Sequence, residues 1–467
     1  MDIIEFLKEI ETKYNVKCIK VNDIEVWPFL RVAYYFTYGE KYSFNGGEKR
    51  ISLRTKIKRV KNFFYGFGNL FKEYEYILFS DALERRFVNG KYIDKIVEVL
   101  ISELGKNETL LIEDSVNGSL LRYSNPLTEN IISLDLFHTL CQLFLLIPQK
   151  VVINNEFLLE EINKKYSLNI NYRSKIFRFL YYTNIFRRFY KVYKPKAIFI
   201  NCYYTLIHQA ALYAAKQMGI KVVELQHGII NKQHPAYNVF AELDKHFFPD
   251  YLFAFGDYVK TQQNYINPEN VLAVGSMYLD YIKNKYKPSK ETAEMFGKFR
   301  KKYKRIVTIS SQRILEDKLI DFLKKSASLS KDILYIFVPR DLSKDYSYAN
   351  FLGNIIIIKD LDVYQIMREA DFHSTLWSTC ALEAPALGVP SILININGFA
   401  KKYYSNLLTN RDVTRFVDTP EEFIDIILKW QPKRKKEITN LHSSFYREDH
   451  KKSLKIALKR IGISCQK

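Results

Sequence analysis

The residues best suited to acid–base chemistry lie in the segment VVELQHGIINKQHPAYNVF, at positions 222–240. An apolar, strand-like run ends two residues before His227, and Gly228 follows the histidine directly. Histidine can act as a general base near neutral pH, and glycine permits a tight turn or the close approach of a ligand. We therefore predict that His227 is catalytic and that Gly228 and His234 support its loop. The alternative is that both histidines only hydrogen-bond the loop.

Carboxylates offer a second kind of base. The segment TLLIEDSVNG places Glu113 and Asp114 at the end of another apolar run, and Asp81 follows the run YILFS. A carboxylate at such a position could take a proton from a substrate hydroxyl. We predict Glu113 and Asp114 as catalytic candidates, with Asp81 as a further one. The alternative for the pair is an ordinary acidic connection between a strand and a loop.

Hydroxyl side chains gather in READFHSTLWSTCALEAPALGVPSILI, at 368–394. The pattern predicts a strand, a turn with Ser378 and Thr379, and a helix that contains Glu383 about one turn further on. Serine and threonine at a helix start cap the free backbone amides, and the same groups can bind phosphate. We predict a phosphate site at Ser378 and Thr379, with Glu383 bonding a ribose. The alternatives are simple capping and a glutamate on the helix surface.

A second set of phosphate candidates follows the first and second strands of the same half of the chain. Ser310 and Ser311 lie in TISSQRILED, where Arg313 could add charge, and Arg340 lies in IFVPRDLSKDY. Hydroxyl and guanidinium groups are common phosphate ligands. The alternative is that these are polar loop residues near a domain interface.

These residues need strands to position them, and the apolar runs supply two series. Runs of apolar, β-branched residues separated by helical patterns predict parallel strands buried on both faces. Two series predict two doubly wound α/β domains, in which ligands bind at the carboxyl ends of the strands. The first series comprises 76–80, 109–113, 150–154, 197–201, 221–225, 251–255 and 271–275, and the second 305–310, 333–338, 354–359, 371–375 and 391–395.

Composition narrows the class of protein. The chain has 71 Lys and Arg against 51 Asp and Glu, a net charge of +20, which predicts an anionic partner. Its 15% aromatic content excludes disorder for most of the length. Five separated cysteines without a CxxC pair exclude a disulfide scaffold and argue against a structural zinc site.

Two basic, aromatic segments could meet that anionic partner. They lie at 51–72 and 172–196. One interpretation is helices that pack their aromatic rings inward, and the other is a surface for anionic lipid head groups or a lipid-linked acceptor. The sequence has no RNA-binding or zinc-finger signature and no helix-turn-helix, so we expect no nucleic acid.

The sequence also predicts where the protein resides. The opening MDIIEFLKEIETKY lacks the basic start and apolar core of a signal peptide. The most apolar stretch, at 132–148, contains Asp135 and His138 and is too short and polar to span a bilayer. We expect a cytoplasmic protein, with a peripheral position on the inner face of the cell membrane as a further expectation.

Three motifs together resemble a known family over roughly residues 197–400. The pattern ADFHSTLWSTCALEAPALGVPSILI resembles the nucleotide-binding segment of GT-B glycosyltransferases. The stretch at 253–280 is similar to the end of the first domain of bacterial surface-polysaccharide transferases. The sequence QHG at 226–228 resembles the histidine–glycine turn of capsule-synthesis transferases and of CDP-glycerol glycerophosphotransferases.

This resemblance implies a GT-B architecture of two Rossmann-like domains. The donor nucleotide would bind the second domain and the acceptor the first, with no cofactor and no metal. For that reason Asp360-Leu361-Asp362 is not taken as a metal motif. By analogy with two-domain sugar transferases, the final helix would cross back to the first domain. The expected parts are a basic, partly helical extension at 1–74, the two domains at 75–282 and 283–430, and a basic C-terminal helix at 431–467.

Two departures from the family leave the donor open. Many such enzymes have a His-Pro where this chain has Val338-Pro339-Arg340. Bacterial sialyltransferases of this fold carry an acidic pair followed by glycine, whereas here the glycine after Glu113-Asp114 is displaced.

We predict a glycosyltransferase that uses a CMP-, UDP- or similar nucleotide sugar to build a bacterial capsular or lipopolysaccharide glycan. Its partners would be the nucleotide sugar and a glycan or lipid-linked acceptor. The alternatives are a CDP-polyol phosphotransferase on the same scaffold, a non-catalytic basic module that binds lipid or nucleic acid, and a sugar-nucleotide epimerase of the same fold.

Overall fold

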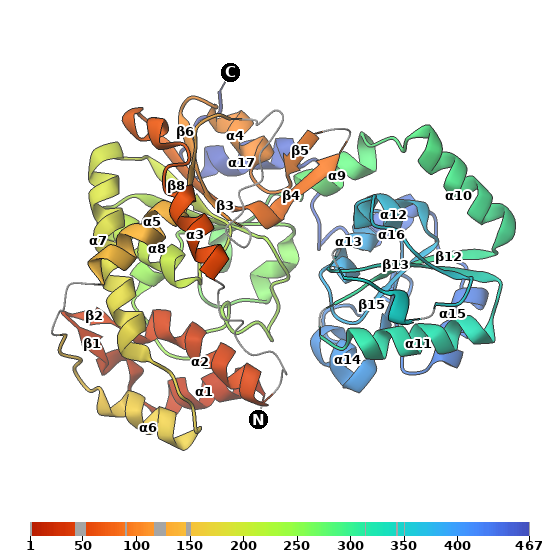
Figure 1. The fold of residues 1–467 in the computed structure, drawn as a ribbon, viewed down its shortest axis with the longest axis horizontal. Coiled ribbons are helices and arrows are strands. Elements are labelled where there is room, and N and C mark those ends of the chain that lie inside the picture. The colour runs from red at the N-terminus through yellow and green to blue at the C-terminus, as the bar shows by residue number, and fades with distance from the viewer. Residues whose placement is uncertain are drawn as a thin grey trace. The chain divides into compact units, whose positions relative to one another are not determined.

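The computed structural model describes residues 2–42, 53–88, 91–115, 128–145, 151–312, 314–341, 344–349 and 351–466. The chain divides into two compact units (Figure 1). The first unit comprises Met1–Val274 with Lys451–Lys467, and the second is Gly275–His450.

A parallel seven-stranded sheet forms the centre of the first unit. Its strand order is β11-β10-β9-β8-β3-β6-β7. Numbered along the chain and read from β7, this is 3-2-1-4-5-6-7, the Rossmann order extended by one strand. The chain reverses its direction of travel between β3 and β8. The strands are β3 (Tyr76–Asp81), β6 (Thr109–Asp114), β7 (Ile131–Ser133), β8 (Ala197–Ile200), β9 (Lys221–Leu225), β10 (Tyr251–Ala254) and β11 (Val271–Ala273).

Helices and two small antiparallel ribbons complete the first unit. The ribbons pair β1 (Lys20–Val21) with β2 (Ile24–Glu25), and β4 (Arg85–Val88) with β5 (Lys91–Asp94). The helices are α1 (Ile3–Lys13), α2 (Trp27–Tyr42), α3 (Leu53–Asn62), α4 (Glu98–Leu104), α5 (Asp135–Phe144), α6 (Phe157–Lys165), α7 (Tyr172–Tyr193), α8 (Leu206–Gln217) and α17 (His450–Arg460).

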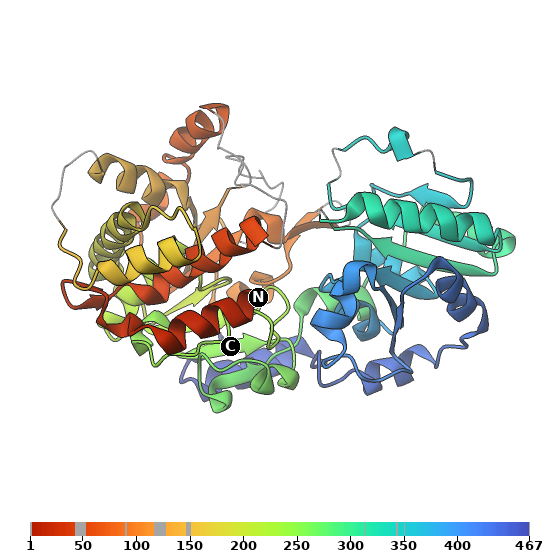
Figure 2. The ribbon, with the colours of Figure 1, turned by 90° about the horizontal axis from the view of Figure 1, so that it is seen from below.

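The expected N-terminal extension is built into the first unit. Phe6 of α1 stacks on Tyr38 of α2 with ring centroids 4.0 Å apart, and Lys165 of α6 pairs with Glu9 of α1. Figures 1 and 2 show these three helices side by side. Helices α1 and α2, within the described residues 2–42, therefore share a core with the first domain and do not stand apart from it.

The C-terminal helix belongs to the first unit, as the sequence predicts. Leu454, Ala457 and Leu458 of α17 are buried in one apolar cluster with Leu78 of β3 and Phe253 of β10. The chain thus returns from the second unit to cover the first sheet, and α17 helps to hold that sheet together.

A parallel six-stranded sheet forms the second unit. Its order, β14-β13-β12-β15-β16-β17, is 3-2-1-4-5-6 along the chain, again the Rossmann order. The strands are β12 (Arg305–Ser310), β13 (Ile333–Val338), β14 (Ile355–Ile357), β15 (Phe372–Thr375), β16 (Ser391–Ile394) and β17 (Thr414–Val417). The helices are α9 (Met277–Asn284), α10 (Lys290–Lys302), α11 (Glu316–Leu329), α12 (Val363–Glu369), α13 (Cys380–Ala386), α14 (Phe399–Tyr404), α15 (Pro420–Lys429) and α16 (Lys435–Leu441).

Alternating side chains of β12 pack on both faces of this sheet. Val307 and Ile309 join a cluster with Leu319 of α11, whereas Ile306 joins another with Phe296 of α10. A strand buried on both faces needs a continuous apolar run, which is why these runs predict the sheet well. The fold is therefore the predicted pair of Rossmann-like α/β domains.

Some predicted elements differ from the structure. The run at 150–154 contributes no strand of the sheet in its described part, where Asn154 forms only an isolated bridge to Lys20. Instead β7 forms at Ile131–Ser133, and β17 was not predicted. The units divide after Val274 rather than after residue 282, and 431–450 belong to the second unit. Among the described residues, no helix has the length and apolarity needed to cross a bilayer.

Candidate active site

A cavity of about 400 Å³ opens at the carboxyl ends of the strands of the first sheet. It lies where β3 and β8 adjoin, at the reversal of strand order, the place where ligands bind in open α/β sheets. Its polar lining comes from several elements. It includes Asp81, Glu84, Asp114, His138, Arg178, Tyr182, Asn201, Thr205, His208 and His227. A larger cavity of about 550 Å³ involves Lys221 and Tyr251, which start β9 and β10, and so lies at the opposite edge of the sheet.

Only one member of the predicted acidic pair lines the cavity. Successive strand residues point to opposite faces, so Asp114 faces the cavity while Glu113 does not. Glu113 is buried and accepts a hydrogen bond from Arg85 Nε at 2.6 Å. Burial raises the pKa of Glu113 to about 8, although Arg85 opposes the rise. Glu113 thus contacts Arg85 inside the protein and does not reach the cavity.

Asp114 has the properties of a base that works near neutral pH. Burial, together with the charges of Asp81 and Asp135, raises the pKa of Asp114 to about 6. Asp81 pairs with Asp114 in the register of β3 and β6 and also lines the cavity. The structure thus brings the candidates Asp81 and Asp114 together.

His227 lies on the same cavity, beyond the end of β9. Burial lowers the pKa of His227, with Glu84 acting in the opposite direction, so the ring is neutral at neutral pH. Its Nε2 lies 3.3 Å from the Tyr204 hydroxyl. A neutral imidazole can accept a proton or orient a hydroxyl group.

The loop that carries His227 is held from both sides. The side chain of Gln226 donates to the carbonyl of Gly228 at 2.8 Å and accepts from the amide of Phe255 at 2.7 Å. A Cβ at Gly228 would meet no atom within 4 Å, and its φ lies outside the left-handed region. The loop conformation does not require glycine there, and close approach of a ligand stays a prediction.

His234 lies behind the cavity rather than in its described lining. Its Nδ1 accepts from the amide of Ala236 at 3.3 Å, and its ring packs 4.7 Å from that of Tyr237. Burial lowers the pKa of His234 to about 3. Its position is that of a residue that supports the loop.

The N-terminal segment holds this same loop. Arg31 of α2 is buried and pairs with Glu11 at 2.7 Å. Its two remaining nitrogens donate to the carbonyls of Pro235 and Asn238, each at 2.8 Å. Residues 1–42 therefore help to shape the loop beside the cavity.

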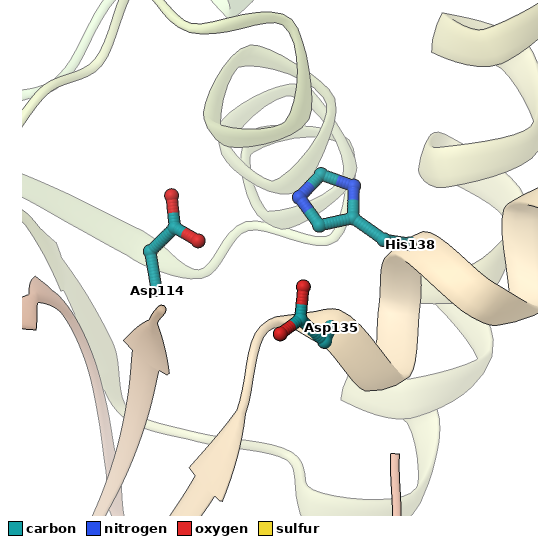
Figure 3. Close-up of side chains that lie close together, drawn as sticks. All are labelled: Asp114, Asp135 and His138. Atoms are coloured by element: carbon teal, nitrogen blue, oxygen red, sulfur yellow. The ribbon is translucent and has the colours of Figure 1, made fainter. Parts of the chain in front are cut away.

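Asp114 and two neighbouring side chains could hold a cation. Carboxylate or imidazole atoms of Asp114, Asp135 and His138 lie within 4.8 Å of one another (Figure 3). Asp135 is fully buried and accepts from Asn62 and Ser115, both at 2.7 Å. Carboxylate and imidazole are suitable ligands for several divalent metals. Arg59 Nε lies 3.5 Å from the Asp135 carboxylate, however, so an ion would compete with an existing positive charge.

The sequence analysis did not single out His138 or His208 as site residues. The Nδ1 of His138 lies 2.7 Å from the Tyr182 hydroxyl, and burial lowers its pKa to about 4. The Nδ1 of His208 lies 2.8 Å from the Cys202 carbonyl, and its buried Nε2 has no hydrogen-bond partner within the described part of the chain. The spacing Asp135-x-x-His138, which places both residues on one helix face, is a signal that could have found the first.

In the second unit, three predicted nucleotide ligands have internal partners. Ser310 Oγ lies 2.8 Å from His373 Nε2, and Ser311 Oγ donates to Glu316 at 2.8 Å. Glu383 accepts from the hydroxyl of Tyr364 at 2.8 Å. All three side chains are buried.

The other candidates lie near the carboxyl edge of the second sheet and are less enclosed. Ser378 Oγ accepts from the amide of Cys380 at 3.3 Å, as a helix cap does. Thr379 precedes α13 but forms no side-chain capping bond. The side chain of Arg340, after β13, is exposed. Arg313 lies outside the described residues.

No protein-family model matches this chain, and no curated protein matches it. Several solved structures are similar to it. The UDP-GlcNAc 2-epimerase from Methanocaldococcus jannaschii in complex with UDP-GlcNAc and UDP has 14% identity and a TM-score of 0.48, over 83% of this chain and 99% of that chain. The UDP-GlcNAc 2-epimerase from Neisseria meningitidis has 10% identity and a TM-score of 0.48, over 82% of this chain and 100% of that chain. The wall teichoic acid polymerase TagF has 12% identity and a TM-score of 0.44, over 86% of this chain and 95% of that chain.

Proposed function

We propose that the protein transfers a sugar from a nucleotide-activated donor to a hydroxyl group of a glycan or lipid-linked acceptor. The observation that carries this proposal is the cavity of the first sheet, where Asp114, with a pKa of about 6, lies on one lining with His227. A general base is most effective when its pKa is near the working pH. We assign the acceptor hydroxyl to this cavity.

In the proposed reaction, Asp114 takes the proton of the acceptor hydroxyl. The acceptor oxygen forms the new glycosidic bond as the bond between the sugar and the donor phosphate breaks, and the nucleotide leaves with that electron pair. His227 is neutral and orients the hydroxyl group. No cofactor takes part.

The donor nucleotide is assigned to the carboxyl edge of the second sheet. Support comes from the resemblance of 370–394 to a nucleotide-binding segment and from the Rossmann strand order of this unit. Ser378, Thr379 and Arg340 are the favoured phosphate ligands. Ser310, Ser311 and Glu383 would each have to exchange an internal hydrogen bond for a ligand.

The finer parts of the proposal rest on the sequence resemblance. We propose a CMP-, UDP- or similar nucleotide sugar as donor and a bacterial capsular or lipopolysaccharide glycan as product. A cytoplasmic enzyme at the inner face of the cell membrane fits that product, because nucleotide sugars are made in the cytoplasm.

The histidine–glycine turn supports a second candidate. His227 lines the cavity and belongs to the turn that resembles that of CDP-glycerol glycerophosphotransferases. In that reaction a phosphopolyol, not a sugar, moves to the acceptor and CMP leaves. Product analysis separates the two, because only the second leaves phosphate on the transferred group.

A thermal-shift panel of CMP, CDP, UDP, GDP, ADP and TDP tests the donor. A nucleotide present at about 100 times its Kd should stabilise the protein by about 2.7 kcal/mol. Thr379→Val should abolish the shift, and Thr409→Val, at an exposed position, should not. If no nucleotide shifts the unfolding temperature, the transferase proposal fails.

A further inference from the structure

One surface of the first unit exposes large apolar side chains next to the candidate active site. Five large apolar side chains in and just after α3 are between 42% and 80% exposed. They are Ile57, Val60, Phe64, Phe67 and Phe71. Scattered exposed apolar residues are ordinary, but a continuous patch marks an interaction site. We call residues 57–71 the aromatic platform.

The aromatic rings of the platform form a continuous chain of contacts. The ring centroids of Phe64 and Phe67 lie 6.5 Å apart, and those of Phe67 and Phe71 lie 5.8 Å apart. Phe63 packs 4.9 Å from Phe64. The patch is therefore one apolar surface and not a set of isolated side chains.

The backbone beneath these rings is fixed to the domain. Asn69 donates to the carbonyls of Glu129 and Ile131 at 2.8 and 3.1 Å, and the hydroxyl of Tyr193 donates to the carbonyl of Leu70 at 2.5 Å. Gly66 has a φ of +69°, and a Cβ there would lie 1.8 Å from the carbonyl oxygen of Ile131. The segment is thus packed closely against the domain while its phenylalanines face outward.

The sequence around the platform is basic throughout. From residue 49 to residue 72 it contains no Asp or Glu. Arg59 and Lys72 contact Asp135 and Asn130, whereas Lys61 is exposed. The basic residues in this stretch are Lys49, Arg50, Arg54, Lys56, Lys58, Arg59, Lys61 and Lys72.

We propose that the aromatic platform docks on an anionic lipid bilayer. Phenylalanine rings enter the boundary between head groups and acyl chains, and nearby cations are attracted to the lipid phosphates. The positive charge of this stretch indicates an anionic partner. The row of exposed phenylalanine rings favours a lipid bilayer over nucleic acid, because nucleic-acid binding depends mainly on cations that contact phosphates.

The second basic segment, 172–196, lacks this arrangement. In α7 the rings of Phe179, Tyr182 and Phe186 are buried, and Phe186 stacks on Phe137 of α5 at 4.5 Å. These rings belong to the core, and the other aromatic residues of 172–196 are buried or half-buried, so none is exposed as the platform rings are. A membrane role for 172–196 stays a prediction, and no exposed aromatic cluster of this segment supports it.

The platform is joined directly to the cavity. Arg59 and Asn62, both on α3, hold the carboxylate of Asp135, which lies beside Asp114 and His138 (Figure 3). Docking would therefore place the cavity close to the bilayer surface, where a lipid-linked acceptor is found. This last step rests on the proposed function, whereas docking itself does not.

Co-sedimentation of the full chain with lipid vesicles tests the docking. Vesicles of phosphatidylcholine alone are compared with vesicles in which about a third of the lipid is anionic phosphatidylglycerol, whose negative surface potential attracts cationic residues, without donor or acceptor. We expect binding to the anionic vesicles only. The triple variant F64S/F67S/F71S should bind at least about tenfold more weakly.

Two matched variants separate the contribution of the platform rings to vesicle binding from that of charge and from that of any exposed ring. Phe36→Ser with Phe157→Ser removes two rings that are 54% and 60% exposed elsewhere on the first unit, and binding should not change. Lys61→Glu keeps all rings and should weaken binding by about fivefold or more. Circular dichroism confirms that each variant is folded.

Equal binding by the wild type and the triple variant would overturn the proposal. So would wild-type binding to RNA or DNA in the absence of any binding to vesicles. Because no nucleotide or acceptor is present, failure of the glycosyltransferase proposal would leave these outcomes unaffected.

Discussion

Among single residues, Asp114 is the one on which the proposed chemistry depends most. Burial and two neighbouring carboxylates raise its pKa to about 6, well above the usual value of about 3.9. The same environment that makes Asp114 a useful base disfavours its charge. A catalytic group placed in this way is expected to reduce stability.

The substitution Asp114→Asn should therefore separate activity from stability. Loss of a general base should lower kcat by about 100-fold or more. Because the folded-state pKa is raised, ionisation of Asp114 costs stability as the pH rises from about 4 through about 6, by on the order of 3 kcal/mol. The variant should be more stable than the wild type at pH 8 and equal to it below pH 4, as measured by urea unfolding.

Asp23→Asn, at an exposed position of the same unit, is the control and should change neither quantity. An Asp114→Asn variant that keeps wild-type activity would remove Asp114 from the mechanism. A variant less stable than the wild type at pH 8 would show that the charged carboxylate is favoured in the fold.

The cluster of Asp114, Asp135 and His138 leads to a prediction about metals. The proposed reaction needs no metal, so treatment with EDTA should leave the rate of sugar transfer unchanged. Loss of activity that Mg²⁺ or Mn²⁺ restores would contradict this expectation and would make the three residues a metal site.

At the scale of elements, helices carry the part of the site that the sequence did not indicate. Asp81, Asp114 and His227 follow apolar runs, and the ends of parallel strands can be located from such runs. His138 and His208 reach the cavity only because α5 and α8 pack beside the sheet. Which helix face turns inward depends on contacts with distant residues, and one sequence does not reveal these contacts.

The difference between local apolar runs and long-range contacts also explains which strands were predicted wrongly. The runs that became β3, β6, β8, β9 and β10 are buried on both faces, so their apolar character is continuous. The run at 150–154 is similarly apolar, but its described residues, 151–154, do not pair within the sheet. β17 is an edge strand with two half-buried positions, and its sequence TRFV gives little signal.

The helix α17 gives a test at this scale. Leu458 is fully buried against the first sheet, so Leu458→Ala should lower the free energy of unfolding of the first unit by about 2–5 kcal/mol. Ile456, on the same helix, is 57% exposed, and Ile456→Ala should cost less than about 0.5 kcal/mol. Urea unfolding followed by hydrogen exchange in each unit measures both effects. An equal effect of the two substitutions would contradict the packing of α17.

At the scale of the whole molecule, the two Rossmann-like units were predictable and their boundaries were less so. Two series of strand runs required two sheets, and the structure has two parallel sheets of the doubly wound kind. The sequence resemblance covers only about residues 197–400, yet α1 and α2 are part of the first unit and Arg31 binds the loop beside the cavity. Long-range contacts of this kind have no local pattern in the sequence.

The most direct test of the account is the pH dependence of nucleotide release, once the panel has identified the donor. With the donor and an acceptor hydroxyl present, kcat/KM of the wild type should fall about tenfold per pH unit below about pH 6, because protonated Asp114 cannot act as a base. Asp114→Asn should lose this acidic limb together with most of its activity. A wild-type rate that stays constant from pH 7 to pH 4.5, or an acidic limb that survives in Asp114→Asn, would contradict the assignment of Asp114 as the base in this cavity.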